Sequence, residues 1–104
     1  MVEFHFEDST QTLLCRFEGH MDTVMSGNVT EAYNAELCRL RVKMEMLKIV
    51  FDLKGVDYVA SSFLRLSLLA AKGIKKGNFS ILNAAPQVLK VFQVARLSSL
   101  LNVS

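Results

Sequence analysis

The sequence predicts an α/β fold, with a mixed sheet of four or five strands and helices packed mainly on one face of it. Apolar and polar residues alternate over residues 2–6 and 11–17, which is the period of a half-buried strand. Residues 49–53 form a short apolar run typical of a buried strand, and from residue 63 the apolar spacing becomes helical. With the segments between and after them, these patterns give the order ββαβαβα.

Length and composition indicate one globular domain over residues 1–104. Hydrophobic residues make up 51% of the chain and charged residues 21%, a balance typical of globular proteins rather than disordered ones. A formal net charge of +2 gives no support for nucleic-acid binding. No apolar run reaches the ~18 residues of a membrane span, and no basic segment precedes an apolar one at the N-terminus. We therefore expect a cytoplasmic protein that binds neither nucleic acid nor membrane.

The first two strands are predicted to form a hairpin, because only the short polar segment 7–10 separates them. On the second strand Leu13, Cys15 and Phe17 share one face, which we expect to be buried. Gly19 is expected to end this strand.

A helix is predicted next, over residues 27–44. Ser26 is one candidate N-cap, and Asn28, with Glu31 three residues later, is the alternative. The inward face is an apolar stripe at helical spacing, made of Val29, Tyr33, Leu37, Leu40 and Met44.

The central segment combines the buried strand with a second helix. Residues 54–55 are expected to end the strand, and residues 56–59 to form a loop. Ser61 or Ser62 is then a natural N-cap of a helix that ends at Gly73. A serine in this place lies at the positive end of the helix dipole, where free N–H groups would also stabilise a phosphate.

The remainder of the chain is predicted to form one more strand and one more helix. The strand covers residues 78–82, and Pro86 lies at or just inside the start of a helix over residues 87–96. Residues 97–103 are expected to be a brief final strand or a packed extension.

Cys15 and Cys38 are isolated and lie in differently patterned segments. We expect small buried thiols in a reducing compartment, with a disulfide between them as the alternative.

Other polar residues give no sign of a catalytic or metal centre. His5 and His20 have no cysteine or carboxylate at metal-ligand spacing, so they are expected to be surface residues. Asp52 is placed in a strand and Asp57 in the loop after it, which favours capping and turn roles over acid–base catalysis. The sequence predicts no metal and no cofactor.

The strand–loop–Ser-Ser–helix unit resembles the signature of the STAS domain, as found in bacterial anti-sigma factor antagonists. In that family Asp-Ser-Ser-Gly-Leu opens the helix, and its first serine, matched here by Ser61, is the phosphorylation site. Ala60 stands where the family usually has Asp, and Phe63 where it usually has Gly.

Two further elements extend the resemblance over essentially the whole chain. Gly19, Met21 and Asp22 match the family's Gly-x-apolar-Asp element, and residues 83–86 match its Asn, short loop and Pro. The resemblance implies the STAS fold and places Asp22 near the serine segment.

The function implied by the resemblance is phosphorylation-dependent partner switching in the regulation of transcription. The unphosphorylated domain would bind an anti-sigma factor that is also a serine kinase. Phosphorylation of Ser61 would break that complex, and a metal-dependent serine phosphatase would reset it. Ser62 would supply a supporting hydroxyl. The domain itself would catalyse nothing, and its docking surface would comprise Asp22, Ser61, Ser62 and Phe63.

Three questions stay open from the sequence. Phe63 either folds into the core or stands beside the serine as an aromatic docking anchor, and its usual replacement by Gly in the family favours partial exposure. The departures at Ala60 and Phe63 also fit a STAS scaffold or regulatory module that has lost the switch. A small enzyme with Ser61 as nucleophile is a third hypothesis, but it lacks an evident base.

Overall fold

The structure is a computed structural model, and it describes residues 1–40 and 46–104. Its elements are β1 (Val2–Glu7), β2 (Thr12–Met21), α1 (Thr23–Arg39), β3 (Lys48–Val59), α2 (Ser61–Lys72), β4 (Phe79–Leu82) and α3 (Pro86–Val94). This is the predicted order ββαβαβα, and the α/β class is confirmed.

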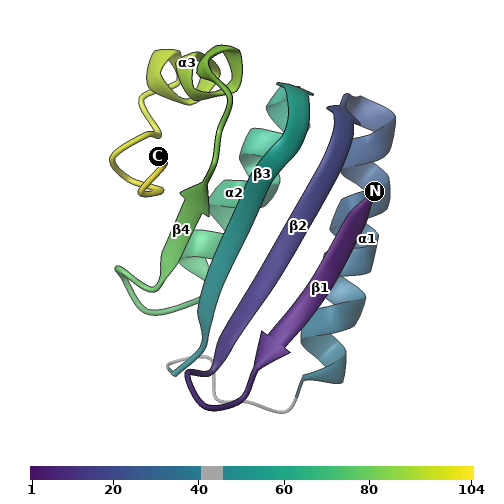
Figure 1. Ribbon diagram of the computed structural model, residues 1–104, viewed down its shortest axis with the longest axis vertical. Coiled ribbons are helices and arrows are strands. Elements are labelled where there is room, and N and C mark those ends of the chain that lie inside the picture. Colours follow the sequence, from purple (N-terminus) through teal and green to yellow (C-terminus); the bar gives the residue numbers. More distant parts are fainter. Residues whose placement is uncertain (41–45) are drawn as a thin grey trace.

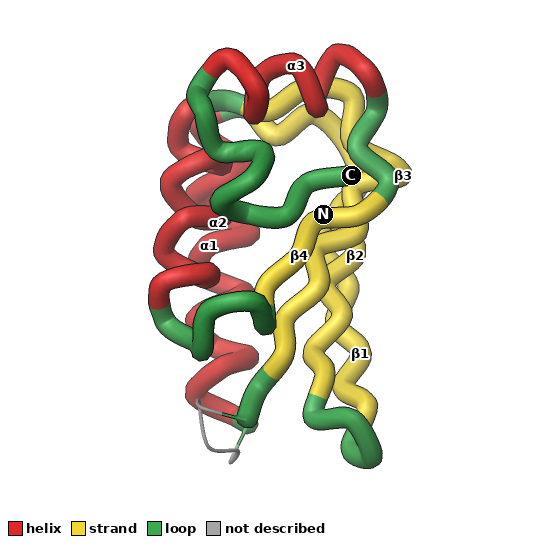
Figure 2. Tube along the Cα trace, turned by 90° about the vertical axis from the view of Figure 1, so that its left-hand side faces the viewer, coloured by secondary structure: helices red, strands yellow, loops and turns green. Residues whose placement is uncertain are grey.

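The four strands form one mixed sheet in the order β1-β2-β3-β4. β1 is antiparallel to β2, whereas β2, β3 and β4 run parallel to one another. Parallel neighbours need crossover connections, and α1 and α2 supply them. Both helices cover the same face of the sheet, and α3 lies across the end of the sheet where β3 ends (Figures 1 and 2). The predicted mixed sheet with helices mainly on one face is confirmed.

β2 has the predicted buried face but not the predicted end. Leu13, Cys15 and Phe17 are buried, as their alternation predicts. The strand continues through Gly19 to Met21. Gly19 has a φ of 102° and lies where the register with β3 is irregular. A glycine accepts this left-handed conformation at little cost, so it permits a bulge here instead of ending the strand.

β3 also runs past its predicted end. Residues 54–59 were expected to be a strand break and a loop, and the structure extends the strand to Val59. Gly55 pairs with Glu18 of β2, and a Cβ at residue 55 would lie 2.9 Å from the Glu18 Cγ. Glycine is therefore needed for the close approach of these two strands.

α1 begins one turn earlier than predicted. Asp22 is its N-cap, with a side-chain oxygen that accepts a hydrogen bond from the Met25 N–H at 2.9 Å. The predicted caps Ser26 and Asn28 are therefore wrong, because both lie inside the helix. α1 also ends earlier than predicted, because its last residue is Arg39 and Leu40 is the C-cap in an extended conformation, with φ −75° and ψ 131°. The predicted end at Met44 is therefore wrong, and Met44 itself lies outside the described residues.

The inward stripe of α1 agrees with the prediction where the structure describes it. Val29 and Tyr33 are buried, and Leu37 and Leu40 are partly buried against the core.

α2 matches its predicted range, but neither serine is its N-cap. Ala60 holds the cap position in an extended conformation, with φ −88° and ψ 169°, and no side chain caps the helix. The Ala60 N–H donates to the Met21 carbonyl oxygen at 2.8 Å. This bond holds Ala60 in an extended conformation at the end of the strand, so the helix starts at Ser61. The N-cap is the residue before the first helical residue, so it is Ala60 and neither serine.

The C-terminal part follows the prediction closely. β4 is the expected strand, and Pro86 is at the first helical position of α3. After α3 the chain forms turns, with Leu101 buried and Val103 in an isolated parallel bridge to Ile81. Of the two predicted endings, the packed extension is the one observed.

Aromatic rings join the sheet to the helices in the core. The Phe51 ring of β3 lies 4.8 Å from that of Phe17 on β2 and 4.9 Å from that of Phe79 on β4, centroid to centroid. Tyr33 of α1 packs edge-on against Phe51 at 5.8 Å. Phe63 of α2 packs edge-on against Phe17 at 5.1 Å.

Phe63 is a core residue. Its side chain is 0% exposed, so the predicted partial exposure and the role as a docking anchor are wrong. α2 lies against the sheet, and its third residue points at the rings of β2 and β3.

The two cysteines have different environments. Both are free; Cys15 is buried as predicted, whereas Cys38 is exposed, contrary to prediction. Burial, with a smaller effect of the nearby Glu36 carboxylate, raises the pKa of the Cys15 thiol, which therefore stays protonated and unreactive.

Phe63→Ala should destabilise the fold by roughly 3–5 kcal/mol, because it removes a fully buried ring and leaves a cavity. Urea unfolding would measure the change. Leu69→Ala is the matched control, since Leu69 is on the same helix but 60% exposed, and it should cost no more than about 0.5 kcal/mol. Equal losses for the two variants would contradict the core position of Phe63.

Ala60→Asp should stabilise the fold by about 0.5–2 kcal/mol, because it supplies the side-chain acceptor that α2 lacks. The same unfolding measurement applies. Ala60→Asn separates hydrogen bonding from charge, since it caps without a formal charge. A gain from neither variant would show that residue 60 is not the N-cap.

Candidate functional site

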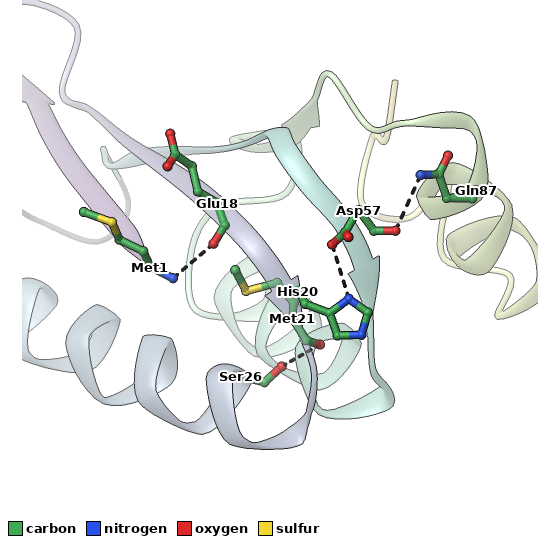
Figure 3. Close-up of polar contacts among 7 residues, drawn as sticks. All are labelled: Met1, Glu18, His20, Met21, Ser26, Asp57 and Gln87. Atoms are coloured by element: carbon green, nitrogen blue, oxygen red, sulfur yellow. Dashed lines mark hydrogen bonds and ion pairs between the residues drawn. The ribbon is translucent and has the colours of Figure 1, made fainter.

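The ends of β2 and β3 bring the starts of two helices together. Met21 pairs with Val59 across the two strands. The Met21 carbonyl oxygen accepts from the Ala60 N–H at 2.8 Å and from the Ser26 Oγ of α1 at 3.2 Å, the latter drawn in Figure 3. This one oxygen therefore links β2, α1 and the segment that leads into α2.

Asp22 and Ser61 each come one residue after this hydrogen-bonded pair. Asp22 begins α1 and Ser61 begins α2, so their backbones lie at the same edge of the sheet, as the resemblance implies. The Asp22 side chain is exposed, and its carboxylate caps its own helix. A part for Asp22 in docking stays a prediction.

The two serines differ in accessibility. Ser61 is exposed, whereas Ser62 is partly buried and its Oγ is a buried atom without a hydrogen-bond partner among the described residues. The hydroxyl of Ser62 therefore makes no contact that would support Ser61. Phe63, the fourth predicted docking residue, adds nothing to the surface because it is fully buried.

His20, Asp57 and Tyr58 form an exposed cluster at the same end of the sheet. The rings of His20 and Tyr58 stack with centroids 4.4 Å apart and an interplanar angle of 16°. The His20 Nδ1 lies 3.3 Å from an Asp57 carboxylate oxygen, as Figure 3 shows. His20 is thus a surface residue as predicted, but it is not isolated.

No pattern in the sequence indicates this cluster. Along the register that pairs Arg16 with Asp52, His20 would lie opposite Val56, and two register shifts between β2 and β3 place it opposite Tyr58 instead.

Neither aspartate of β3 lies in a loop. Asp57 was predicted in a loop and lies in the strand, where its carbonyl oxygen accepts a 3.5 Å hydrogen bond from Gln87 of α3 (Figure 3). Asp52 accepts from the Lys54 N–H at 3.1 Å and from Asn83 Nδ2 at 3.0 Å. The Asp57 carboxylate contacts His20, whereas the Asp52 carboxylate accepts from Lys54 and Asn83, so the two carboxylates contact different parts of the chain.

The described residues contain no acid–base arrangement at Ser61. No side chain of residues 1–40 or 46–104 hydrogen-bonds to the Ser61 hydroxyl, and no group of three His, Cys, Asp or Glu residues in these ranges could hold a metal ion. What the arrangement offers is an exposed hydroxyl at a helix N-terminus without a side-chain cap, where added negative charge is favourable.

Among the described residues, no helix is both long and apolar enough to cross a bilayer.

Sequence comparison gives no relative. No protein-family model matches the chain, and no curated protein matches it.

Comparison of the fold gives clear similarities. An anti-sigma-factor antagonist (STAS) domain protein from Planctomyces limnophilus superposes with a TM-score of 0.81 at 20% identity, covering 99% of this chain and 87% of that one. An anti-sigma factor antagonist from Mycobacterium paratuberculosis has a TM-score of 0.77 at 16% identity, covering 99% and 85%.

A third similarity is to SpoIIAA, an anti-sigma factor antagonist. Its unphosphorylated form has a TM-score of 0.73 at 17% identity, covering 100% of this chain and 88% of SpoIIAA. The phosphorylated form of the Bacillus protein has a TM-score of 0.65 at 16% identity, covering 100% and 91%. Similarity at these identities concerns the three-dimensional structure, and on that basis the chain has the STAS-domain fold.

Proposed function

We propose that this domain is an anti-sigma factor antagonist that works by phosphorylation-dependent partner switching. With Ser61 unmodified, it docks on an anti-sigma factor that is also a serine kinase and thereby displaces the sigma factor. The observation that carries this proposal is the exposed Ser61 at the start of α2, beside Asp22. The existence of SpoIIAA, with the same fold, in unphosphorylated and phosphorylated forms supports it.

The chemistry of the switch belongs to the partners. The kinase transfers the terminal phosphoryl group of ATP to the Ser61 Oγ, which loses its proton, and ADP leaves. The phosphoserine carries up to two negative charges on the docking surface, so repulsion and the cost of desolvation break the complex. A metal-dependent serine phosphatase hydrolyses the ester and restores the hydroxyl. Action on a sigma factor implies a bacterial, cytoplasmic setting.

Accessibility favours Ser61 over Ser62 as the modified residue. A kinase must place the acceptor oxygen in its own active site. The Ser62 Oγ is buried, so it would first have to become exposed. Asp22, Ser61 and the exposed part of Ser62 form the docking surface in this proposal.

A second candidate is a STAS scaffold or regulatory module without the switch. The replacement of the family's usual Asp by Ala60 favours it, because kinase recognition could depend on that carboxylate. An enzyme with Ser61 as nucleophile has less support, since no described side chain is placed to activate that hydroxyl. Hydrolysis of a simple ester that disappears in Ser61→Ala would favour the enzyme.

Ser61 is expected to be the residue phosphorylated by a purified anti-sigma factor kinase of the source organism. Mass spectrometry after incubation with ATP should find one phosphate, lost in Ser61→Ala and kept in Ser62→Ala. Ser62→Ala is also the matched control, because it removes the adjacent hydroxyl. Phosphate retained in Ser61→Ala would reject the assignment, and a chain never phosphorylated would favour the scaffold.

Ser61→Asp should weaken binding to the same kinase by roughly tenfold or more, while the fold stays intact. A carboxylate in the first turn of a helix is compatible with the dipole, so unfolding free energy should stay within a few tenths of a kcal/mol or rise. Calorimetry would measure binding, and urea unfolding the stability. Ser99→Asp places the same charge on another exposed serine and should bind like wild type. Equal affinity for both variants would reject a charge switch at residue 61.

A further inference from the structure

A groove of about 330 Å³ lies between α1 and α2 and reaches the first turn of α2. Its walls include Thr23, Gly27 and Thr30 of α1 and Ser62, Arg65 and Leu69 of α2. Gly27 leaves the α1 side open, because a Cβ built there would meet no heavy atom within 4 Å. Leu69 offers an exposed apolar side chain to any group that enters.

Arg65 is the charged residue of this groove. Within the part of the chain that the structure describes, it forms no ion pair. The neighbouring carboxylates at this end of the sheet are directed elsewhere, since Asp22 caps α1 and Asp57 faces His20. The groove therefore combines apolar walls with one available positive charge, which suits a partner carboxylate beside an apolar side chain.

The Ser62 hydroxyl is a second, independent sign of a ligand group. Its Oγ is buried beside the groove without a hydrogen-bond partner among the described residues. A buried polar atom without a partner is rare in folded proteins, and a rotation of the Ser62 side chain toward the groove would let its hydroxyl donate to an acceptor there. α2 also has no side-chain cap, so its first-turn N–H groups are donors at the same end.

Ser61 and Arg65 are four residues apart on α2, and side chains at this spacing are neighbours on a helix surface. A phosphate on Ser61 would therefore lie within reach of the Arg65 guanidinium, which pairs with phosphate through two parallel hydrogen bonds.

We propose that Arg65 is the second half of the switch at Ser61. With Ser61 unmodified, its guanidinium binds a carboxylate of the partner, whose adjacent apolar side chain enters the groove against Leu69. With Ser61 phosphorylated, the phosphate on the same helix captures the guanidinium. Modification then removes an attractive group from the docking surface as well as adding a repulsive one. This inference rests on the proposed function.

The first test needs no partner. Phosphoserine is installed at residue 61 by genetic-code expansion, and the phosphate is titrated by phosphorus NMR. The second ionisation of phosphoserine has a pKa of about 6, and a guanidinium beside it favours the dianion. Removing that guanidinium should raise the observed value, so we expect it to be higher by about half a unit in Arg65→Gln than in wild type.

The control variant is Lys72→Gln, which removes one positive charge from the last turn of the same helix. Lys72→Gln changes the net charge by the same amount as Arg65→Gln and leaves the N–H groups at the start of α2 in place. The phosphate in this variant should therefore titrate as in wild type. Arg65→Lys should fall between wild type and Arg65→Gln, since an ammonium pairs with phosphate less specifically. Identical titration of wild type and Arg65→Gln would overturn the inference.

The second test measures binding of the unmodified domain to the kinase by calorimetry. Arg65→Gln should weaken the complex roughly tenfold, because it leaves a partner carboxylate unpaired, and Lys72→Gln should not. If phosphorylation of Ser61 abolishes binding while Arg65→Gln binds as wild type does, this inference fails and the proposed function stands. If Arg65→Gln weakens binding but phosphorylation does not, the proposed function fails, and the switch role of Arg65 fails with it.

Discussion

The arrangement of the candidate site depends on the Met21 carbonyl oxygen. It accepts hydrogen bonds from the Ala60 N–H and from the Ser26 hydroxyl, so it uses both lone pairs. One bond holds the end of β3 beside the end of β2, and the other holds the first turn of α1 against the same strand. The starts of α1 and α2 are consequently side by side, and two positive helix ends share one edge of the sheet.

Periodicity was sufficient to predict most elements of the fold but not the lengths of the central strands. The alternation around Leu13 and Cys15, and the apolar run that contains Phe51, identify strands whatever their neighbours are. Gly19 and Gly55 look like strand ends because glycine usually interrupts a local pattern. In the structure one permits a bulge and the other a close approach to Glu18, and both functions depend on the neighbouring strand. A single-strand pattern contains no information on that neighbour.

The candidate site shows the same division between local and long-range causes. Resemblance was enough to select Ser61 and Asp22, because each is identified by residues next to it in sequence. The helix cap was assigned wrongly because a distant bond to Met21 keeps Ala60 extended. The contact between His20 and Tyr58 depends on a strand register with two irregularities, which no spacing rule predicts. The burial of Phe63 does not follow from the usual Gly of the family, because a glycine gives no information on the direction of a larger side chain.

The two departures from the family's motif have opposite effects on α2. Ala60 forgoes a cap worth about 0.5–2 kcal/mol. Phe63 buries a complete aromatic ring against Phe17 and Phe51, and burial of such a side chain contributes about 1.5–3 kcal/mol before packing is counted. Core packing can therefore offset the missing cap. Phe63 holds α2 against the sheet, while the first-turn N–H groups of the helix have no side-chain acceptor. Because no side chain competes for these N–H groups, they would stabilise a phosphate on Ser61 most strongly.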